Sequence, residues 1–519
     1  MLISMAVYMV VVLIIGIICA KRNKTADDFY LGGRKLNPLV AAMSAEASDM
    51  SSWLLMGLPG LAFLSGVADA GWTAIGLAVG TYLNWLIVAK RLRRYTVVAR
   101  NSITLPDFFS NRFHDKHKIL MSVSALMILI FFVPYTASGF AACGKLFSSL
   151  FQLDYFWAML LSAVVIVAYT TIGGFLAAST TDLMQGIVMS IALVIVLVFG
   201  ISTAGGVGAV MENAQNMPGF LSMFDVHVPA TGGSEPYGFL KIVSMMAWGL
   251  GYFGMPHVLL RFMAIRSEHQ LKTSRRIASV WVVISLFVSV MIGVIGAKAI
   301  PELLDRSSLV GAGADTLAAA TSQSETIFIK IADTLANSGI LPALLAGVIL
   351  AGILAATMST ADSQLLAASS SVAQNFFKGL ICKNAKEKTT MWVARGTVIV
   401  IAIIAVMIAS DPNSSVFEIV SFAWAGFGAT FGPLVLFSLF WKRTTLQGAL
   451  AGMVSGGVMI FLWKFLIKPL GGVWGIYELL PAFIVASILI LVVSLLTKAP
   501  SQEIVDEFEL AADKTRAVE

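Results

Sequence analysis

Long apolar stretches recur along the whole chain and limit what it can fold into. A helix that crosses a lipid bilayer needs about 20 predominantly apolar residues. Hydrophobic residues make up 58% of the 519 residues and charged residues only 12%, which leaves too little polar surface for a soluble protein of this size. We therefore expect an all-α polytopic membrane protein with about 13 transmembrane helices, at approximately 2–20, 38–66, 72–90, 118–148, 155–175, 182–203, 237–264, 273–298, 338–378, 391–410, 414–440, 446–468 and 476–497.

The loops between these stretches differ in charge, and the difference predicts the orientation. Lysine and arginine gather in loops on one side of the membrane, the cytoplasmic side by the positive-inside rule, at 21–35, 90–118, 266–276, 378–388 and 442–443. The loop 204–236 on the other side contains neither residue. The chain is thus expected in the cell membrane with its N-terminus outside and its C-terminus in the cytoplasm. The formal charge of +6 therefore reflects basic residues in short membrane loops and not a nucleic-acid-binding surface. No nucleic-acid partner is predicted.

The stretch 38–66 is interrupted near its middle by the polar residues of SAEASDMSSWLLMGLPG, residues 44–60. Ionisable residues at bilayer depth normally face a partner, a cavity or an ion, and non-helical backbone survives there only where its carbonyls find something to bind. Glu46, Asp49 and the neighbouring serines therefore predict a broken helix that offers oxygens to a small cation near the midplane, as in secondary transporters. The alternative is a polar patch that holds two helices together.

A second interruption lies at residues 248–256, WGLGYFGMP, where three glycines and a proline fall within one apolar stretch. Two broken helices at corresponding places in two halves of opposite orientation indicate an inverted repeat with a binding site between the halves. The expected organisation is a first helix and cytoplasmic loop (1–37), a first five-helix repeat (38–203), an external loop (204–236), a second five-helix repeat (237–440), two C-terminal helices (441–497) and a frayed cytoplasmic tail (498–519). The segment 301–338 is expected to form a short helix that is not a span.

A third feature is AGILAATMSTADSQ, residues 351–364, on the ninth predicted helix. Ala356, Ser359, Thr360 and Ser363 recur at a spacing of three or four, which places hydroxyl groups and small residues on one helix face. Hard cations prefer oxygen ligands, so adjacent Ser359 and Thr360 could supply the hydroxyl half of a sodium site opposite the first broken helix. The alternative is an ordinary packing seam of small residues.

At these three stretches the chain resembles the sodium/solute symporter family, and within it the branch that carries proline. The likeness covers nearly the whole chain through DDFYLGGRKLNP, LPDFF, FFVPYTASGF, TIGGFLAASTTD, SFAWAGFGATFGPLVLFSLFWKR, GALAGM and LLTKAPS. It implies a leucine-transporter-like five-plus-five inverted repeat and sodium-driven uptake of L-proline by alternating access. The implied partners are Na⁺, the small-molecule substrate and the lipid bilayer, with no obligatory protein partner.

The resemblance also implies which residues bind sodium. The ligands would be the backbone carbonyls of Ala47, Met50 and Ala356 with the hydroxyls of Ser359 and Thr360, and Asp49 would be important for sodium coupling. A second sodium, known in some relatives, would involve Asp182, Asp362 and Ser363, although Asp362 stands where a serine is expected. The alternative for Asp182 is the cap of a helix start.

The implied substrate pocket consists of Ser51, Ser52, Tyr135, Trp248, Tyr252 and Pro256. Trp248 and Tyr252 are four residues apart and share a helix face, so they could form an aromatic box for an apolar ring; the alternative is core packing. Two residues depart from the proline branch, because Ser52 replaces an expected glycine and Glu46 replaces a small residue.

Three other functions stay open on sequence alone. These are a carrier of the same fold for another small solute (a different amino acid, a carboxylate, pantothenate or a sugar), a proton-coupled carrier that uses Asp49 and Glu46, and a sensor or channel. No enzyme is predicted, because the chain has no nucleotide-binding loop, catalytic triad or phosphate-binding glycine motif. The three isolated cysteines and five scattered histidines predict neither a disulfide framework nor a zinc site.

Overall fold

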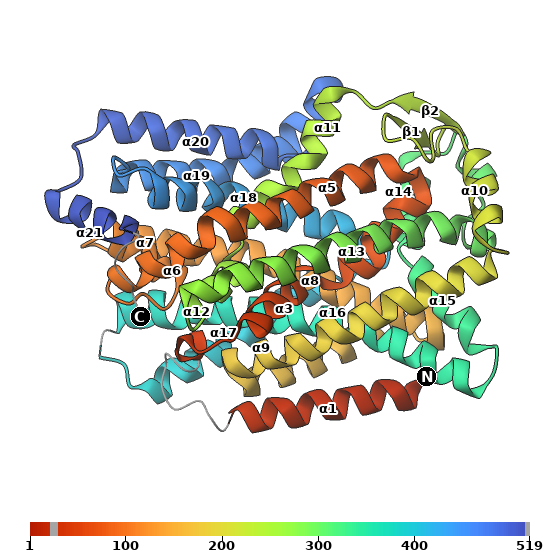
Figure 1. Ribbon diagram of the computed structural model, residues 1–519, viewed down its shortest axis with the longest axis horizontal. Coiled ribbons are helices and arrows are strands. Elements are labelled where there is room, and N and C mark those ends of the chain that lie inside the picture. The colour runs from red at the N-terminus through yellow and green to blue at the C-terminus, as the bar shows by residue number, and fades with distance from the viewer. Residues whose placement is uncertain (21–29, 383, 514–519) are drawn as a thin grey trace.

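The computed structural model describes residues 1–20, 30–382 and 384–513, and most of its helices run along the long axis of the molecule (Figure 1). Nine described helices are long and apolar enough to cross a membrane, ten if one bent pair counts as a single span, and three shorter apolar helices accompany them. The prediction of an all-helical polytopic membrane protein is confirmed. Lys21, Arg22 and Lys24 of the first basic loop, and residues 514–519 of the tail, lie outside the described residues.

Two ends of the molecule serve as landmarks. The end that carries α6 (Ala89–Val98), α7 (Leu105–Arg112) and α21 (Gln502–Ala512) is here called the tail end. The opposite end, with strands β1 (Asp225–Val228) and β2 (Gly233–Pro236), is called the hairpin end (Figure 1). The chain starts at the hairpin end and its C-terminal helix lies at the tail end.

The N-terminal part of the chain contains a broken helix followed by several long ones. Its elements are α1 (Leu2–Ala20), η1 (Gly32–Arg34), α3 (Pro38–Asp49), η2 (Trp53–Gly57), α4 (Leu58–Ser65), α5 (Val67–Leu83), η3 (Asn84–Val88), α6 (Ala89–Val98), α7 (Leu105–Arg112), α8 (Ile119–Phe151) and α9 (Tyr155–Thr203). Asn37 caps α3 by accepting a hydrogen bond from the Val40 amide, with Pro38 in the first turn, a favoured helix start. The predicted spans 155–175 and 182–203 both lie within α9, whose stretches Tyr155–Ala168 and Phe175–Thr203 are each apolar.

The rest of the chain begins with the predicted loop 204–236, which contains a short helix and a two-stranded antiparallel sheet. The elements are α10 (Val207–Gln215), β1 (Asp225–Val228), β2 (Gly233–Pro236), α11 (Phe239–Met246), η4 (Ala247–Gly254), α12 (Pro256–Ala264), η5 (Glu268–Gln270), α13 (Leu271–Ala299), η6 (Pro301–Leu303), η7 (Arg306–Leu309), α14 (Ala314–Ser324), α15 (Ile327–Ala336), α16 (Ile340–Ser370), η8 (Ser371–Ile381), α17 (Glu387–Ile408), α18 (Val416–Phe440), α19 (Leu446–Leu462), η9 (Trp463–Ile467), η10 (Lys468–Leu470), η11 (Gly472–Gly475), α20 (Leu479–Leu496) and α21 (Gln502–Ala512). The segment 301–338 forms short helices only, as expected.

Both predicted interruptions are present. The first helix ends at Asp49, and Ser51 has a positive φ of 23°, an unfavourable conformation for a residue other than glycine; a wide π-helical turn, η2, follows. The second is the 3-10 segment η4, after which Met255 is extended and α12 leaves at an angle of 47°. Pro256 accounts for this end, since a proline disfavours helical backbone at the preceding residue.

Glycines allow the second broken helix to lie directly against α5. A Cβ atom added at Gly80 would stand 2.3 Å from the Gly249 carbonyl oxygen, and one added at Gly249 would stand 2.2 Å from the Gly76 carbonyl oxygen. Only residues without a side chain permit this approach of two backbones. The contact fixes the position of η4 relative to the first half of the chain.

A buried ion pair joins three helices toward the hairpin end. Lys145 on α8 lies 2.7 Å from Glu325, and both side chains are at most 5% exposed. Glu325 also accepts hydrogen bonds from the amides of Val416 and Phe417 and from the hydroxyl of Ser415. These groups form the start of α18, so the carboxylate lies where a helix N-terminus favours negative charge.

Candidate functional site

The first broken helix and α16 meet at the residues predicted to bind sodium. The Ser359 hydroxyl lies 2.8 Å from the Ala47 carbonyl oxygen and 3.1 Å from the Ala356 carbonyl oxygen. All three residues are fully buried. The Ser359 hydroxyl is therefore within hydrogen-bonding distance of two other predicted sodium ligands, although Ala47 and Ser359 are 312 residues apart in sequence.

The other two predicted ligands, Thr360 and Met50, lie close in sequence to Ser359 and Ala47. The Thr360 hydroxyl is buried and has no hydrogen-bond partner among the described residues, which is unusual because buried polar groups are normally paired. The Met50 carbonyl accepts only a long bond of 3.3 Å from the Leu54 amide. Carbonyl and hydroxyl oxygens of this kind are ligands that a hard cation prefers, and Thr360 is the sequence neighbour of Ser359, whose hydroxyl contacts two such carbonyls.

Asp49 connects the break to the second broken helix. Its carboxylate accepts a hydrogen bond of 2.6 Å from the Tyr252 hydroxyl, and its other carboxylate oxygen has no partner among the described residues. Its backbone carbonyl accepts a hydrogen bond of 3.0 Å from the Tyr135 hydroxyl and one of 3.4 Å from the Trp53 indole. Side chains thus take the place of the helical amide that the break removes.

The two serines after Asp49 have different environments. The Ser51 hydroxyl accepts a bond of 3.3 Å from the Trp53 amide and so closes the break locally. The Ser52 hydroxyl is fully buried without a partner in the described part of the chain. Ser52 therefore offers a polar group at the position where a glycine was expected.

The predicted aromatic pair is part of a larger aromatic cluster. Trp248 stacks on Tyr477 at 5.1 Å between ring centroids and lies 6.0 Å from Trp53, and Tyr252 meets Trp424 edge-on at 5.0 Å. The Trp424 indole donates to the Trp248 carbonyl at 2.8 Å. Sequence reasoning found Trp248 and Tyr252 but missed Trp424 and Tyr477, because ordinary apolar stretches surround both.

The carbonyl groups of η4 also find partners outside their own helix. The Asn84 side chain donates to the Tyr252 carbonyl at 2.9 Å. Pro256 opens α12 immediately beyond the extended residue Met255. Its predicted place at the second break is therefore correct, and the contacts that hold the break come from neighbouring helices.

A cavity of about 670 Å³ leads from the aromatic cluster toward the hairpin end. Trp248, Phe417 and Tyr477 line it together with residues of α11, which directly follows β2 (Figure 1). Lys241, Lys464, Lys468 and Glu418 supply most of its charge. Of the residues predicted for the substrate pocket, Trp248 lines this cavity.

The residues predicted for a second sodium lie together, but they surround an arginine. The Arg261 guanidinium lies 3.0 Å from the Asp182 carboxylate and donates to the Ser363 hydroxyl at 2.6 Å. Ser363 is 3.4 Å from the carboxylate of Asp362. Sequence reasoning missed Arg261, although a lone arginine within an apolar stretch is a signal of function by itself. Occupation of this cluster by sodium stays a prediction.

At the tail end, the C-terminal helix is docked and is not frayed as expected. Ile504, Phe508 and Ala511 of α21 are buried, and the Phe508 ring lies 4.8 Å from the Arg91 guanidinium. Burial of this apolar face explains why a short charged segment is ordered here.

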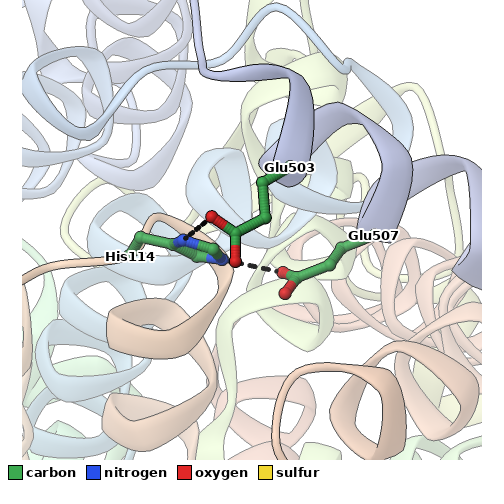
Figure 2. A group of neighbouring side chains, drawn as sticks. All are labelled: His114, Glu503 and Glu507. Carbon is green, nitrogen blue, oxygen red and sulfur yellow. Dashed lines mark hydrogen bonds and ion pairs between the residues drawn. The ribbon is translucent and has the colours of Figure 1, made fainter.

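One group of side chains at this docking surface could hold a metal ion by distance alone. His114, Glu503 and Glu507 each place a ligand atom within 4.8 Å of the others. Figure 2 shows both carboxylates on the same side of the imidazole: Nδ1 is 3.7 Å from Glu503 and Nε2 is 3.0 Å from Glu507. Each carboxylate is therefore nearest to a different ring nitrogen, and the contact to Glu507 is the one at hydrogen-bonding distance. Sequence spacing could not reveal this group, because His114 lies nearly 400 residues from the two glutamates, 393 in the case of Glu507.

Comparison with known proteins gives one consistent result. Residues 29–456 match the family described as the sodium:solute symporter family. The chain is 44% identical to a sodium/proline symporter of Haemophilus influenzae over 98% of its own length and 97% of the relative, and 44% identical to that of Escherichia coli over 96% and 94%. A sodium/proline symporter of Staphylococcus aureus is 40% identical over 99% and 96%.

Solved structures agree on the fold. A Na⁺-coupled sialic acid symporter in a substrate-bound outward-open state superposes with a TM-score of 0.75 at 19% identity, over 96% of this chain and 98% of that one. Mhp1, a nucleobase-cation-symport-1 transporter, superposes with a TM-score of 0.54 at 13% identity, over 94% and 99%. At these identities the likeness concerns the fold alone.

Proposed function

Because this chain belongs to the sodium:solute symporter family, we infer that it is a multi-pass cell-membrane transporter, and not an enzyme, that carries L-proline together with sodium. Near full-length identity of 40–44% to sodium/proline symporters is the single observation that carries this inference. Sodium and proline are then its co-transported substrates. The proposals below concern how the described residues perform this transport.

We propose that thirteen helices cross the membrane, the number predicted from the apolar stretches of the sequence. Ten of them would form two inverted repeats, 38–203 and 237–440. The first helix of each proposed repeat is broken, at Met50–Ser51 and at Met255. The charge of the loops supports an orientation with the tail end in the cytoplasm and the hairpin end outside. With this orientation the 670 Å³ cavity opens outward.

The sodium site is proposed to consist of the carbonyls of Ala47, Met50 and Ala356 and the hydroxyls of Ser359 and Thr360. A bare ion in a low-dielectric interior is stable only if protein oxygens replace its water. The 2.8 Å contact between Ser359 and Ala47 supports this grouping, and so does the Thr360 hydroxyl that lacks a partner in the described chain. A sodium ion would give that hydroxyl a partner and would fix α3 against α16.

Coupling is proposed to run through the break itself. Asp49 follows Ala47 by two residues and bonds the Tyr252 hydroxyl at 2.6 Å, so an ion that orders the break also sets the position of Tyr252. The substrate pocket would then be formed by Ser51, Ser52 and Tyr135 with Trp248, Tyr252 and Pro256. Aromatic rings suit the apolar proline ring, and helix ends freed by the breaks can receive its carboxylate and amine.

The energy of one sodium ion is sufficient for uptake. One charge that moves down 100 mV contributes about 2.3 kcal/mol, and a tenfold sodium gradient contributes about 1.4 kcal/mol more. Together they support an accumulation of roughly 500-fold.

The direct test is uptake of radiolabelled proline into proteoliposomes with and without an imposed sodium gradient. Sodium-dependent accumulation is expected, and competition by other unlabelled solutes should be weak. If a different amino acid, a carboxylate, pantothenate or a sugar competed more strongly than unlabelled proline, that compound and not proline would be the preferred substrate. Accumulation in sodium-free buffer that depends on a pH gradient would show that protons are the coupling ion.

Replacement of Trp248 or Tyr252 by alanine is expected to weaken proline binding about tenfold at saturating sodium. Loss of an aromatic wall removes buried contact area worth about 1.5 kcal/mol or more. Binding of labelled proline to purified protein measures the effect. Trp281→Ala is the matched control, because Trp281 bonds Ser190 on α9 away from the site. Unchanged proline affinity in both variants would show that Trp248 and Tyr252 serve core packing and do not bind the substrate.

A further inference from the structure

Arg261 is a fully buried arginine at the junction of four helices. It extends from α12, is 1% exposed, and pairs with Asp182 on α9 at 3.0 Å. It also donates to the hydroxyl of Ser44 on α3 at 3.0 Å and to that of Ser363 on α16 at 2.6 Å. The face of Phe175 lies 5.0 Å from the guanidinium. A buried ion pair is weak support for stability, so a charge held at this junction calls for another explanation.

The junction lies next to the proposed sodium site, on its tail-end side. Ser44 precedes Ala47 by one helical turn on α3, and Ser363 follows Ser359 by one turn on α16. The helix α3 begins at the tail end and α16 ends there (Figure 1), so both serines are displaced in the same direction. An ion leaving toward the tail end between α3 and α16 would meet the guanidinium first.

The charges around this route also favour a gate. Asp182 pairs with Arg261, and Asp362 contacts Ser363, to which Arg261 also donates. Within the described chain one carboxylate oxygen of each aspartate has no hydrogen-bond partner, nor has the Gln185 side-chain oxygen. The same carboxylates cannot surround a sodium ion while Arg261 occupies the space between Asp182 and Ser363. A tethered cation at this place repels a free one.

The helix that carries Arg261 is suited to move it. The helix α12 starts at Pro256 directly after the extended residue Met255 and the 47° bend. Residues at an element boundary that absorb a change in backbone angles are typical hinges. Rotation of α12 at Met255 would withdraw the guanidinium from α9 and α16 together.

We propose that Arg261 is the gate that closes the tail-end exit of the sodium site: the ion leaves only after the guanidinium has released Asp182 and Ser363. The proposal rests on the sodium-coupled function above and adds a residue that controls ion release. It also places one sodium, and no second one, in the described conformation.

The test is the flux of ²²Na⁺ in proteoliposomes without proline, normalised to the number of sodium-dependent proline-binding sites. Arg261→Gln should raise this uncoupled flux at least about threefold and lower the plateau of proline accumulation, with proline affinity within about twofold of wild type. Arg261→Lys keeps a cation and should restore most of the seal. Arg275→Gln removes an arginine that contacts only the Tyr82 ring among the described contacts, and it should leave the flux unchanged.

The outcomes separate the gate from the function it serves. Wild-type protein without sodium-dependent uptake would overturn the proposed function before any variant is compared. If Arg261→Gln binds proline and leaks no more sodium than Arg275→Gln, the gate is wrong. If Arg261→Gln yields no binding sites, Asp182→Asn removes the partner of the guanidinium instead; raised uncoupled flux in that variant supports the gate and unchanged flux overturns it.

Discussion

Replacement of Asp49 by asparagine is expected to lower sodium-driven proline uptake about 100-fold at fixed sodium. Asparagine can still accept the hydrogen bond from Tyr252, so the change removes the negative charge and little else. A carboxylate about 6 Å from a cation contributes about 3 kcal/mol at an effective dielectric constant of about 20, which corresponds to roughly a 100-fold change in affinity. Uptake measured over a range of sodium concentrations should show a higher sodium requirement.

Glu46→Gln is the matched control for this variant. Glu46 is equally buried and one turn earlier on α3, but its carboxylate accepts a hydrogen bond of 3.0 Å from the Trp85 indole, and its other oxygen has no hydrogen-bond partner among the described residues. Its sodium requirement should stay within about threefold of wild type, because the proposed ligands and Asp49 are unchanged. Equal losses in the two variants would mean that α3 needs buried carboxylates for a reason other than sodium coupling.

Replacement of Thr360 by alanine is expected to raise the sodium concentration for half-maximal uptake about 30-fold. A hydrogen-bonding group that serves a charged partner contributes about 1.5–3 kcal/mol, and a loss of about 2 kcal/mol corresponds to about 30-fold. Since the Thr360 hydroxyl bonds no described residue, its loss should cost little folding stability. Ser359→Ala should act in the same direction, with an added loss of the contact to Ala47.

Thr357→Ala tests whether any buried threonine on α16 would do the same. The Thr357 hydroxyl bonds the Ile353 carbonyl of its own helix at 3.0 Å, so it is not available to an ion. We expect wild-type sodium dependence in this variant. Wild-type dependence in Thr360→Ala and Ser359→Ala as well would remove both hydroxyls from the site.

The sequence was sufficient for the features that depend on local chemistry. Glycines and Pro256 mark the second break, and polar residues around Asp49 mark the first, because backbone that leaves the helix in a membrane needs special residues at that place. Ser359 and Thr360 also stand out in the sequence, as adjacent hydroxyls on an apolar helix, and their role in sodium binding stays a prediction.

Contacts between distant segments were not predictable in this way. The partners of Arg261 are 79 residues away at Asp182 and 217 residues away at Ser44, and no local pattern fixes which helices meet. The order of α21 was not predicted, because its apolar face is short. The helix is stabilised by distant residues, among them Arg91 and Arg112, whose guanidinium groups pack against the Phe508 ring.

The pairing of Lys145 with Glu325 has a consequence for biogenesis. Translation delivers Lys145 to the bilayer long before Glu325, which is 180 residues later, and the donors of Ser415, Val416 and Phe417 arrive later still. Glu325 supplies the partner of the Lys145 ammonium group, and residues 415–417 then supply the hydrogen-bond donors of the Glu325 carboxylate. A nascent chain released before residue 415 would retain a carboxylate deprived of three donors, and we expect membrane proteases to degrade such fragments faster than the finished protein.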